Sequence, residues 1–351
     1  MFYRLSAGLL IIVVVAFSLL ASVKSWLDIH LEQPLRIEGK NNLIHVAPGS
    51  SLSLLSRQLS AEGFIHTPYP LLIYGRLEAM DQIKAGDYEV VEGQSLRRFL
   101  ERLVAGDVIR FRITFPEGRS LKEWLQIINS HEKLAAQDQI GLDQVEARFS
   151  APTGESLEGW FFPDTYTFTS SDDAINILSQ AHRNMVAVLA EEWRGRSDNL
   201  PIETPYEALI LASIIEKETG VPQERGAIAG VFVRRLEKGM KLQTDPTVIY
   251  GLGGDYSGNL TRAHLRALTP YNTYQVSGLP PTPITNPGRE AIHAALHPQP
   301  GTALFFVARG DGSHQFSDTL AEHQRAVREY QLRRVKDYRS APKVDGSRNE
   351  R

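Results

Sequence analysis

The longest apolar run of the chain lies at its N-terminus. Residues Leu5–Val23 read LSAGLLIIVVVAFSLLASV and include no charged side chain. As a helix with a rise of 1.5 Å per residue, this run spans roughly 28 Å, close to the thickness of the hydrocarbon core of a bilayer. A cleaved signal peptide is the alternative, but its apolar region is shorter and ends in small residues, which Leu19-Leu20-Ala21 fits poorly. The pattern therefore favours an uncleaved transmembrane anchor within residues 1–24.

A shorter pattern of polar and apolar positions occurs three times in the first third of the chain. It reads G-x-S-L-x-x-(L/F/W)-x-x-x-(L/I) and begins at Gly49, Gly93 and Gly118. A turn glycine, an N-cap serine and apolar residues spaced three and then four apart predict a turn followed by a helix. The strand-like runs that precede the three copies are Leu43–Val46, Asp87–Val91 and Ile109–Phe115. We expect three strand-turn-helix units.

The first unit, a second helix near Pro70–Glu78 and the strand Asp87–Val91 together predict a small β-α-α-β module within residues 43–110. This order is similar to that of LysM domains, a type that binds glycans containing N-acetylglucosamine. A packing or spacer module of the same topology is the alternative, and no aromatic patch decides between the two. Residues 25–42, before the module, show no clear period and predict a polar connector.

After Phe115-Pro116-Glu117-Gly118 the composition changes, which predicts a larger mixed α+β domain over residues 111–339. The expected helices are Leu121–Ser130, Leu142–Arg148, Ala174–Trp193, Arg225–Lys238 and Leu320–Lys336. The runs Ala303–Ala308 and His314–Phe316 flank a turn-forming segment and predict a β-hairpin. Residues 340–351 are expected to be a disordered tail. The chain as a whole is therefore expected to be of the α+β class, with an N-terminal transmembrane helix.

One helix of this domain combines an unusually apolar sequence with two acidic residues at its end. Pro205 suits its first turn, and Glu216 and Glu218 stand in its last turn. At about 100° per residue, Glu218 projects on the same side as Leu211 and Ile215, whereas Glu216 points nearly the opposite way. Apolar surroundings and the negative end of the helix dipole raise a carboxyl pKa, and a glutamate that keeps its proton near pH 7 can act as a general acid. The alternative is that both glutamates only solvate the end of the helix.

Polar and aromatic residues gather in the segments that follow this helix. Candidate contacts to a substrate are Gln243, Asp245, Tyr250, Asn272 and Tyr274. Long loops rich in tyrosine, asparagine and proline beside a buried carboxyl suggest an oligosaccharide cleft. For each of these residues taken alone, support of the fold is the alternative to substrate contact.

Four motifs occur in the order EKETG, LQTDPTVIYG, YNTY and GLPP. Together they resemble the YceG-like family of membrane-anchored endolytic murein transglycosylases, and the resemblance covers nearly the whole chain. It implies an enzyme of the inner membrane, with the bulk of the chain in the periplasm. Such an enzyme cleaves β-1,4 bonds between MurNAc and GlcNAc in nascent peptidoglycan glycan strands and limits their length. Peptidoglycan synthases are the protein partners that this reading suggests.

The resemblance also implies a mechanism with a single carboxyl group. Glu218, followed by Thr219, is similar to the Glu-Ser/Thr pair at the end of the catalytic helix in lytic transglycosylases, so Glu218 is the expected general acid and base. Such an enzyme protonates the leaving oxygen and then activates the C6 hydroxyl of the muramoyl residue, which gives a 1,6-anhydro end. A hydrolase with two carboxylates, of which Asp245 is the second, is one alternative. A membrane-tethered glycan-binding scaffold without activity is the other.

Composition adds few constraints. Hydrophobic residues make up 42% of the 351 residues and charged residues 23%, as in ordinary folded proteins. The net charge of −3 gives no support for a nucleic-acid partner, and the absence of cysteine excludes disulfides and cysteine-based metal sites. We expect no cofactor and no metal ion. We expect no metal-ligand spacing such as H-x-x-x-H on one helix among His264, His293, His297, His314 and His323. His314, in the predicted hairpin, is a weak candidate for the functional site.

Overall fold

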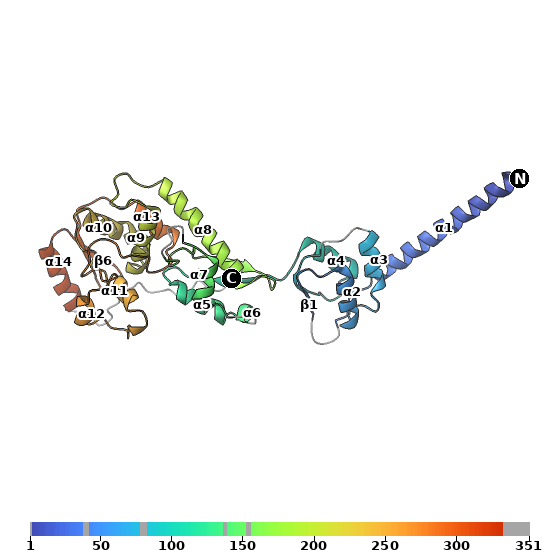
Figure 1. Ribbon diagram of the computed structural model, residues 1–351, viewed down its shortest axis with the longest axis horizontal. Coiled ribbons are helices and arrows are strands. Elements are labelled where there is room, and N and C mark those ends of the chain that lie inside the picture. The colour runs from blue at the N-terminus through green and yellow to red at the C-terminus, as the bar shows by residue number, and fades with distance from the viewer. Residues whose placement is uncertain (1, 38–41, 78–82, 136–138, 152–155, 333–351) are drawn as a thin grey trace. The chain divides into compact units, whose positions relative to one another are not determined.

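The computed structural model describes residues 2–37, 42–77, 83–135, 139–151 and 156–332. The chain divides into two compact units (Figure 1), of which the first comprises residues 1–112 and 167–173 and the second residues 113–166 and 174–351. Both units contain helices and a short antiparallel pair of strands, which confirms the α+β class.

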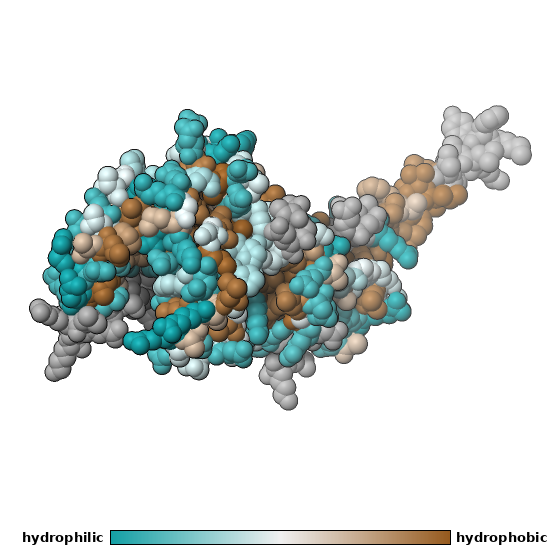
Figure 2. Space-filling view, turned by 60° about the vertical axis from the view of Figure 1, so that its left-hand side comes forward, coloured by the Kyte–Doolittle hydropathy of each residue, from teal (hydrophilic) through white to brown (hydrophobic). Residues whose placement is uncertain are grey.

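The first unit begins with one long helix, α1 (Phe2–Leu31). Apolar side chains from Leu10 to Val23 are exposed on it, and Figure 2 shows part of this apolar surface. By length and composition the helix can cross a membrane. It continues into residues 25–31, which the sequence pattern places in a polar connector, and there Leu27 and Leu31 are buried. The C-terminal part of α1 is therefore packed into the core of the first unit.

The residues after α1 form the predicted β-α-α-β arrangement. Its elements are β1 (Leu43–Val46), α2 (Leu52–Ala61), α3 (Tyr69–Leu77) and β2 (Gly86–Glu89). The strands pair antiparallel, and Val46 lies opposite Gly86. Ile44, Val46 and Tyr88 are buried together with the apolar stripe of α2. Alternation along the strands and helical spacing in α2 thus produce one common core.

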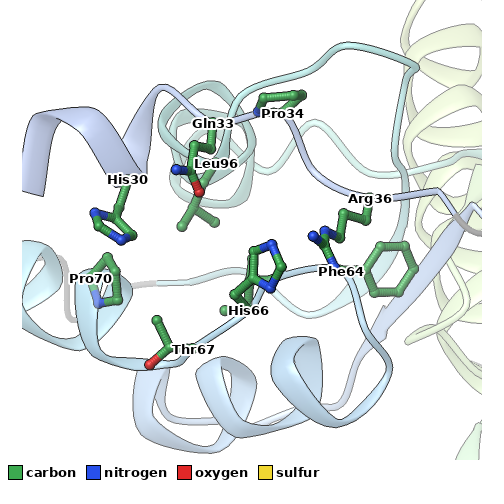
Figure 3. Close-up of a pocket in the computed structure, with 10 residues that line it drawn as sticks. His30, Gln33, Pro34, Arg36, Phe64, His66, Thr67, Pro70 and Leu96 are labelled. Carbon is green, nitrogen blue, oxygen red and sulfur yellow. The ribbon is translucent and has the colours of Figure 1, made fainter.

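A pocket of about 260 Å³ lies on one side of the first unit (Figure 3). It is surrounded by the end of α1, the segment that follows it and the loop between α2 and α3. Its polar lining residues are His30, Gln33, Arg36, His66 and Thr67, and its apolar ones include Phe64 and Leu96. None of the residues that line it is a carboxylate. The candidate general acid therefore lies elsewhere.

The three repeated motifs build helix N-termini as predicted. Ser51, Ser95 and Ser120 are the N-caps of α2, α4 (Leu96–Ala105) and α5 (Leu121–Ser130). Each serine hydroxyl accepts a hydrogen bond from the backbone N–H three residues later. The glycine that opens each motif has φ between +72° and +78°, a conformation that disfavours residues with a Cβ. The glycine turns the chain, and the serine satisfies an N–H that the helix leaves unpaired.

The second unit is arranged around one buried helix, α9 (Pro205–Glu218). The helices that pack against it are α8 (Ala174–Arg194), α10 (Arg225–Glu237), α11 (Asp245–Leu252) and α13 (Arg289–Leu296). In α9, Tyr206 and residues 208–215 are all buried. This continuous burial explains the unusually apolar sequence, since no side of the helix faces water.

Two of these helices differ from the expectation. The sequence pattern predicts a loop at Asp245, whereas Asp245–Leu252 form α11. Pro246 stands in the first turn of α11, where the missing N–H of a proline costs no hydrogen bond. The helix α13 is not predicted either. Its inward-facing residues include Ala291, Ala294 and Ala295, all buried, and such small side chains give only a weak helical hydrophobic pattern.

The remaining elements complete the fold. They are β3 (Phe111–Thr114), which pairs with β4 (Thr165–Phe168), α6 (Glu132–Ala135), α7 (Leu142–Arg148), η1 (Pro222–Glu224), η2 (Gly253–Asp255), α12 (Arg262–Arg266), α14 (Leu320–Val327) and η3 (Arg328–Leu332). The predicted hairpin is confirmed, because β5 (Phe305–Ala308) pairs antiparallel with β6 (His314–Ser317). Of the predicted terminal helix, residues 320–332 are helical. Residues 333–336 and the predicted tail at 340–351 lie outside the described residues.

We expect Ser120→Ala to lower the free energy of unfolding by about 1 kcal/mol, because it removes the N-cap of α5. The cap is a full capping box, in which the Glu123 carboxylate also accepts the N–H of Ser120 at 2.8 Å. Thermal unfolding of the variant measures the loss. Ser130→Ala, an exposed serine at the other end of α5, is the matched control, and an equal loss in both variants would contradict the role of the cap.

Candidate active site

The end of α9 carries two glutamates into the interior of the second unit. The helix starts at the N-cap Thr204, whose hydroxyl accepts the N–H of Glu207 while the Glu207 carboxylate accepts the N–H of Thr204. Pro205 follows at the first helical position, where proline is favoured. Because the middle of α9 is buried throughout, Glu216 and Glu218 in its last turn are held against the surrounding segments.

Burial keeps the carboxyl group of Glu218 partly protonated near neutral pH. The residue as a whole is half-buried, but its carboxyl group is enclosed. Burial raises the pKa of Glu218 to about 7, against the opposing effect of a hydrogen bond from the Thr244 hydroxyl. The negative charge of Asp245 raises this pKa further, and the positive charge of Arg235 lowers it. Glu218 can therefore both give and accept a proton near neutral pH.

Glu216 is buried as well, so the face of the helix does not separate the two glutamates. Its side chain is 6% exposed, and burial raises its pKa. Its carboxylate accepts the N–H of Gly288 at 3.0 Å and lies 3.5 Å from the guanidinium of Arg225. Arg225 also lies 3.7 Å from Glu117. These partners join α9 to neighbouring segments, which gives Glu216 a structural role.

Two of the predicted substrate contacts, Asp245 and Tyr274, interact electrostatically with Glu218, and a third, Gln243, precedes Thr244, which bonds to Glu218. The Tyr274 hydroxyl donates a 2.7 Å hydrogen bond to the Asp245 carboxylate. Burial, together with the charge of Asp245, raises the pKa of Tyr274 well above its usual value, so the hydroxyl remains a donor. Gln243 is exposed and has φ of +51°, a backbone conformation that few residues with a Cβ adopt. Its N–H donates to the carbonyl of Thr273 at 3.1 Å, which fixes the turn before α11.

Asn272, the fourth predicted contact, is buried within its own loop. Its amide nitrogen donates to the carbonyl oxygens of His264 at 3.0 Å and Ala267 at 2.6 Å. Its amide oxygen accepts the N–H of Tyr274 at 3.1 Å. Because both ends of the amide are used in this way, Asn272 supports the loop that presents Tyr274.

Tyr250, the fifth predicted contact, bonds to a carboxyl that sequence reasoning missed. Its hydroxyl donates to Glu158 at 3.3 Å, and the N–H of Leu121 donates to the same carboxylate at 2.9 Å. Glu158 is 7% exposed, and burial raises its pKa to about 7. The rings of Tyr250 and Tyr271 lie 5.1 Å apart. The helix α11 thus has Asp245 near one buried carboxyl and Tyr250 near another. A lone acidic residue directly before an aromatic segment is the sequence signal for Glu158.

Arg235 is a second residue that the sequence did not point to. It comes from α10, is 6% exposed, and donates 2.7 Å hydrogen bonds to the carbonyl oxygens of Leu242 and Leu304. Its guanidinium also lies 5.1 Å from the centre of the Phe305 ring. Held in this way, Arg235 acts on Glu218 through its charge and lowers the pKa that burial raises.

His314 connects the hairpin to the segment that follows α9. Its side chain is 6% exposed, and its Nδ1 lies 2.7 Å from the carboxylate of Glu224. The backbone N–H of His314 donates to the other oxygen of the same carboxylate at 2.9 Å. Glu224 belongs to η1, shortly after Glu218. The pair therefore ties β6 to η1.

Among the described residues, Glu192, His293 and His297 form a group that could hold a metal ion. The expectation that the histidines form no metal site overlooks their spacing. His293 and His297 are four residues apart at the end of α13, which is the H-x-x-x-H spacing of helical metal ligands. The signal was therefore present in the sequence.

The model of the YceG-like family matches residues 44–329. The chain belongs to the YceG-like family. This confirms the resemblance that the four motifs suggest. In the structure the first motif ends α9 and the second contains α11, so both meet at Glu218.

Relatives of known name and a solved structure agree with this assignment. An endolytic murein transglycosylase of Bacillus subtilis is 29% identical over 318 residues, which covers 86% of this chain and 88% of that protein. An endolytic murein transglycosylase of Streptococcus pneumoniae is 26% identical over 322 residues, which covers 82% of this chain and 58% of that protein. A crystal structure of a yceG-like protein from Listeria monocytogenes has 29% identity and a TM-score of 0.51, covering 81% of this chain and 98% of that one.

We expect Asp245→Asn to lower the pKa of Glu218. The charge of Asp245 disfavours ionisation of the neighbouring carboxyl, so without that charge Glu218 loses its proton at lower pH. Carbon-13 NMR titration of the glutamate carboxyls measures the change. Asp255→Asn, just beyond α11, is the control and should leave the pKa of Glu218 unchanged. An unchanged or higher pKa in Asp245→Asn would show that the two carboxyls do not interact as described.

Proposed function

We propose that this protein is a membrane-anchored endolytic murein transglycosylase. It cleaves β-1,4 bonds between MurNAc and GlcNAc within peptidoglycan glycan strands and leaves 1,6-anhydro-MurNAc ends. The observation that carries the proposal is the enclosed carboxyl of Glu218, with a pKa of about 7, at the end of α9. The likeness to proteins named endolytic murein transglycosylase supports the substrate class.

In the proposed reaction Glu218 is first an acid and then a base. It donates its proton to the glycosidic oxygen while the bond from that oxygen to the anomeric carbon breaks. Its carboxylate then accepts the proton of the C6 hydroxyl of the same muramoyl residue, and the C6 oxygen bonds to the anomeric carbon. Glu218 ends the cycle protonated, as it began, and no water is added. Because the nucleophile belongs to the substrate, proximity supplies much of the rate.

The neighbours of Glu218 prepare it for both steps. The Thr244 hydroxyl donates to one carboxyl oxygen, which leaves the other oxygen for the transferred proton. The charge of Asp245 favours the protonated form, and the charge of Arg235 favours the ionised form. A group that must both donate and accept a proton is most effective when its pKa lies near the working pH.

We propose Gln243, Asp245, Tyr250 and Tyr274 as contacts to the glycan. Gln243 and Asp245 are exposed and offer an amide and a carboxylate to sugar hydroxyls. The tyrosines offer hydroxyls and ring faces. Asn272 contributes through the loop that it holds in place.

A hydrolase with two carboxylates is the second candidate, because Asp245 is close enough to Glu218 to raise its pKa. Such an enzyme needs a second carboxylate that is free to activate water or to attack the sugar. One oxygen of Asp245 already accepts the Tyr274 hydroxyl at 2.7 Å, so only the other oxygen is open to a sugar hydroxyl. This contact favours the transglycosylase.

We propose that α1 anchors the protein in the inner membrane and that the rest of the chain lies in the periplasm. The exposed apolar side chains of α1 and the burial of its C-terminal part in the first unit support an anchor that holds this unit at the membrane surface. Residues 43–110 are proposed to be a LysM-like module and residues 111–339 the catalytic domain. An anchored enzyme acts on strands close to the membrane, which suits the trimming of nascent glycan and a partnership with peptidoglycan synthases.

We expect Glu218→Gln to reduce the rate of glycan cleavage by about 10²–10⁴-fold, because glutamine cannot donate the proton to the leaving oxygen. Purified peptidoglycan strands are the substrate, and mass spectrometry identifies the products. The wild-type product should carry the 1,6-anhydro end, lighter by one water than a hydrolysis product. If the wild-type product carries the added water, the protein is a hydrolase and the proposed transglycosylase activity is wrong.

Glu216→Gln is the matched control on the same turn of α9. It should keep most of the activity of the folded enzyme and lose about 1–3 kcal/mol of stability, because Arg225 loses a charged partner. If Glu216→Gln were inactive while folded and Glu218→Gln active, the assignment of the acid would be wrong.

We expect the mature protein to retain Leu5–Val23 and to fractionate with the inner membrane at full length. The apolar run is long enough to span the bilayer, and its flank fits a cleavage site poorly. Mass spectrometry of the protein isolated from membranes gives its N-terminus. A mature chain that starts at Ser22 would restore the signal-peptide interpretation.

A further inference from the structure

A carboxylate and two imidazoles meet where α8 and α13 end. Glu192 lies in the last turn of α8, His293 in α13, and His297 directly after α13. One ligand atom from each of the three lies within 4.8 Å of the other two, and Nδ1 of His293 lies 2.9 Å from Oε2 of Glu192. The two imidazole rings stack with their centres 4.1 Å apart. The group is outside the machinery proposed for glycan cleavage.

Both ring nitrogens of His297 face a backbone carbonyl oxygen. Its Nε2 lies 2.8 Å from the carbonyl oxygen of Gly195, and its Nδ1 lies 3.2 Å from the carbonyl oxygen of His293. A neutral imidazole has one N–H donor and one lone pair, so only one of these contacts can be a hydrogen bond. A protonated imidazole can make both contacts, whereas in metal binding one nitrogen exchanges its carbonyl contact for the ion.

We propose that Glu192, His293 and His297 bind a divalent transition metal ion, with Zn²⁺ as the expected occupant. Two imidazoles and a carboxylate are a common zinc ligand set, and His297, at the C-cap of α13, stacks on the ring of His293 four residues before it. A water molecule completes the tetrahedron. Oxygen-seeking ions such as Mg²⁺ and Ca²⁺ prefer carboxylate and carbonyl ligands to imidazole.

The surroundings of the group hold it in a geometry that needs little change. Tetrahedral ligands about 2.0–2.1 Å from zinc lie about 3.4 Å from one another, so atoms already within 4.8 Å reach the ion by small side-chain rotations. The N–H of Ser197 bonds to the carbonyl of Leu296 at 3.0 Å, which fixes the two helix ends together. Arg289 holds Oε1 of Glu192 at 2.8 Å and leaves Oε2 directed at His293. An outer partner of this kind is common for a ligating carboxylate.

The ion has a structural effect in this position. It links the end of α8 to the end of α13, and α13 packs along α9 and α10. The site is accessible, since the side chain of His293 is 55% exposed, while that of Glu192 is 11% exposed. Zinc therefore stabilises the helical scaffold behind the candidate active site without touching the substrate.

Zinc titration of the full-length protein in detergent, stripped of metals beforehand, tests this proposal. Competition with a chromophoric chelator should show one Zn²⁺ per chain. Free Zn²⁺ at about a hundred times the Kd should raise the Tm by about 5–10 °C, and Mg²⁺ should not. Glu192→Gln, His293→Ala and His297→Ala should each weaken binding at least about tenfold. His66→Ala, an exposed histidine of the first unit, is the matched control and should bind zinc as the wild type does.

The absence of saturable zinc binding would overturn the proposal, as would binding that is equally strong in the three site variants. Circular dichroism confirms that each variant is folded before it is titrated. Glu192→Gln also weakens the contact to Arg289, and if it unfolds the two histidine variants decide the outcome alone. Neither result depends on whether the protein cleaves glycan, because the readouts are metal stoichiometry, affinity and Tm.

Discussion

The middle of α9, residues 208–215, is buried on every side, and the second unit is built to accommodate this. The last turn of α9 carries two carboxyl groups that are withdrawn from water, so each needs a partner from the protein. The capping box at Thr204 supplies hydrogen-bond partners at the N-terminal end of α9. At the other end Gly288 and Arg225 contact Glu216, and Thr244 contacts Glu218. The partners of the last turn come from three different segments, so this turn is complete only in the fully folded chain.

The same burial acts differently on the buried carboxyls, according to what each one contacts. Glu216 has a guanidinium and a backbone N–H, which tie it to its neighbours. Glu158 bonds to the N–H of Leu121 and to the Tyr250 hydroxyl, so it links the start of α5 to α11. Glu218 has a single hydrogen bond from a hydroxyl and two opposed charges at a distance. Only this last environment leaves one carboxyl oxygen for proton transfer, which is why we place the chemistry at Glu218.

Local features were the ones that the sequence predicted well. The glycine-serine motifs, the β-α-α-β order and the hairpin depend on residues a few positions apart, and the structure confirms them. Both the helical wheel and the motif resemblance pointed to Glu218, but the argument from the wheel was wrong, because Glu216 on the opposite face is buried as well. Glu158 and Arg235 were missed, since the contact to Tyr250 joins residues far apart in the chain. The metal-binding group at His293 could not be predicted in full, because Glu192 comes from another helix. The spacing of its two histidines was visible in the sequence and was overlooked.

The proposed reaction explains why a pKa near 7 serves Glu218 better than a higher one. Full burial without a hydrogen bond would hold the proton so strongly that Glu218 would be a poor acid toward the glycosidic oxygen, although its carboxylate would be a strong base in the second step. The Thr244 hydroxyl and the charge of Arg235 offset part of the effect of burial, and Asp245 restores some of it. Because Arg235 is held by backbone carbonyls rather than by Glu218, it stabilises the ionised form without occupying the oxygen that transfers the proton. One carboxyl can then perform both steps that a hydrolase divides between two.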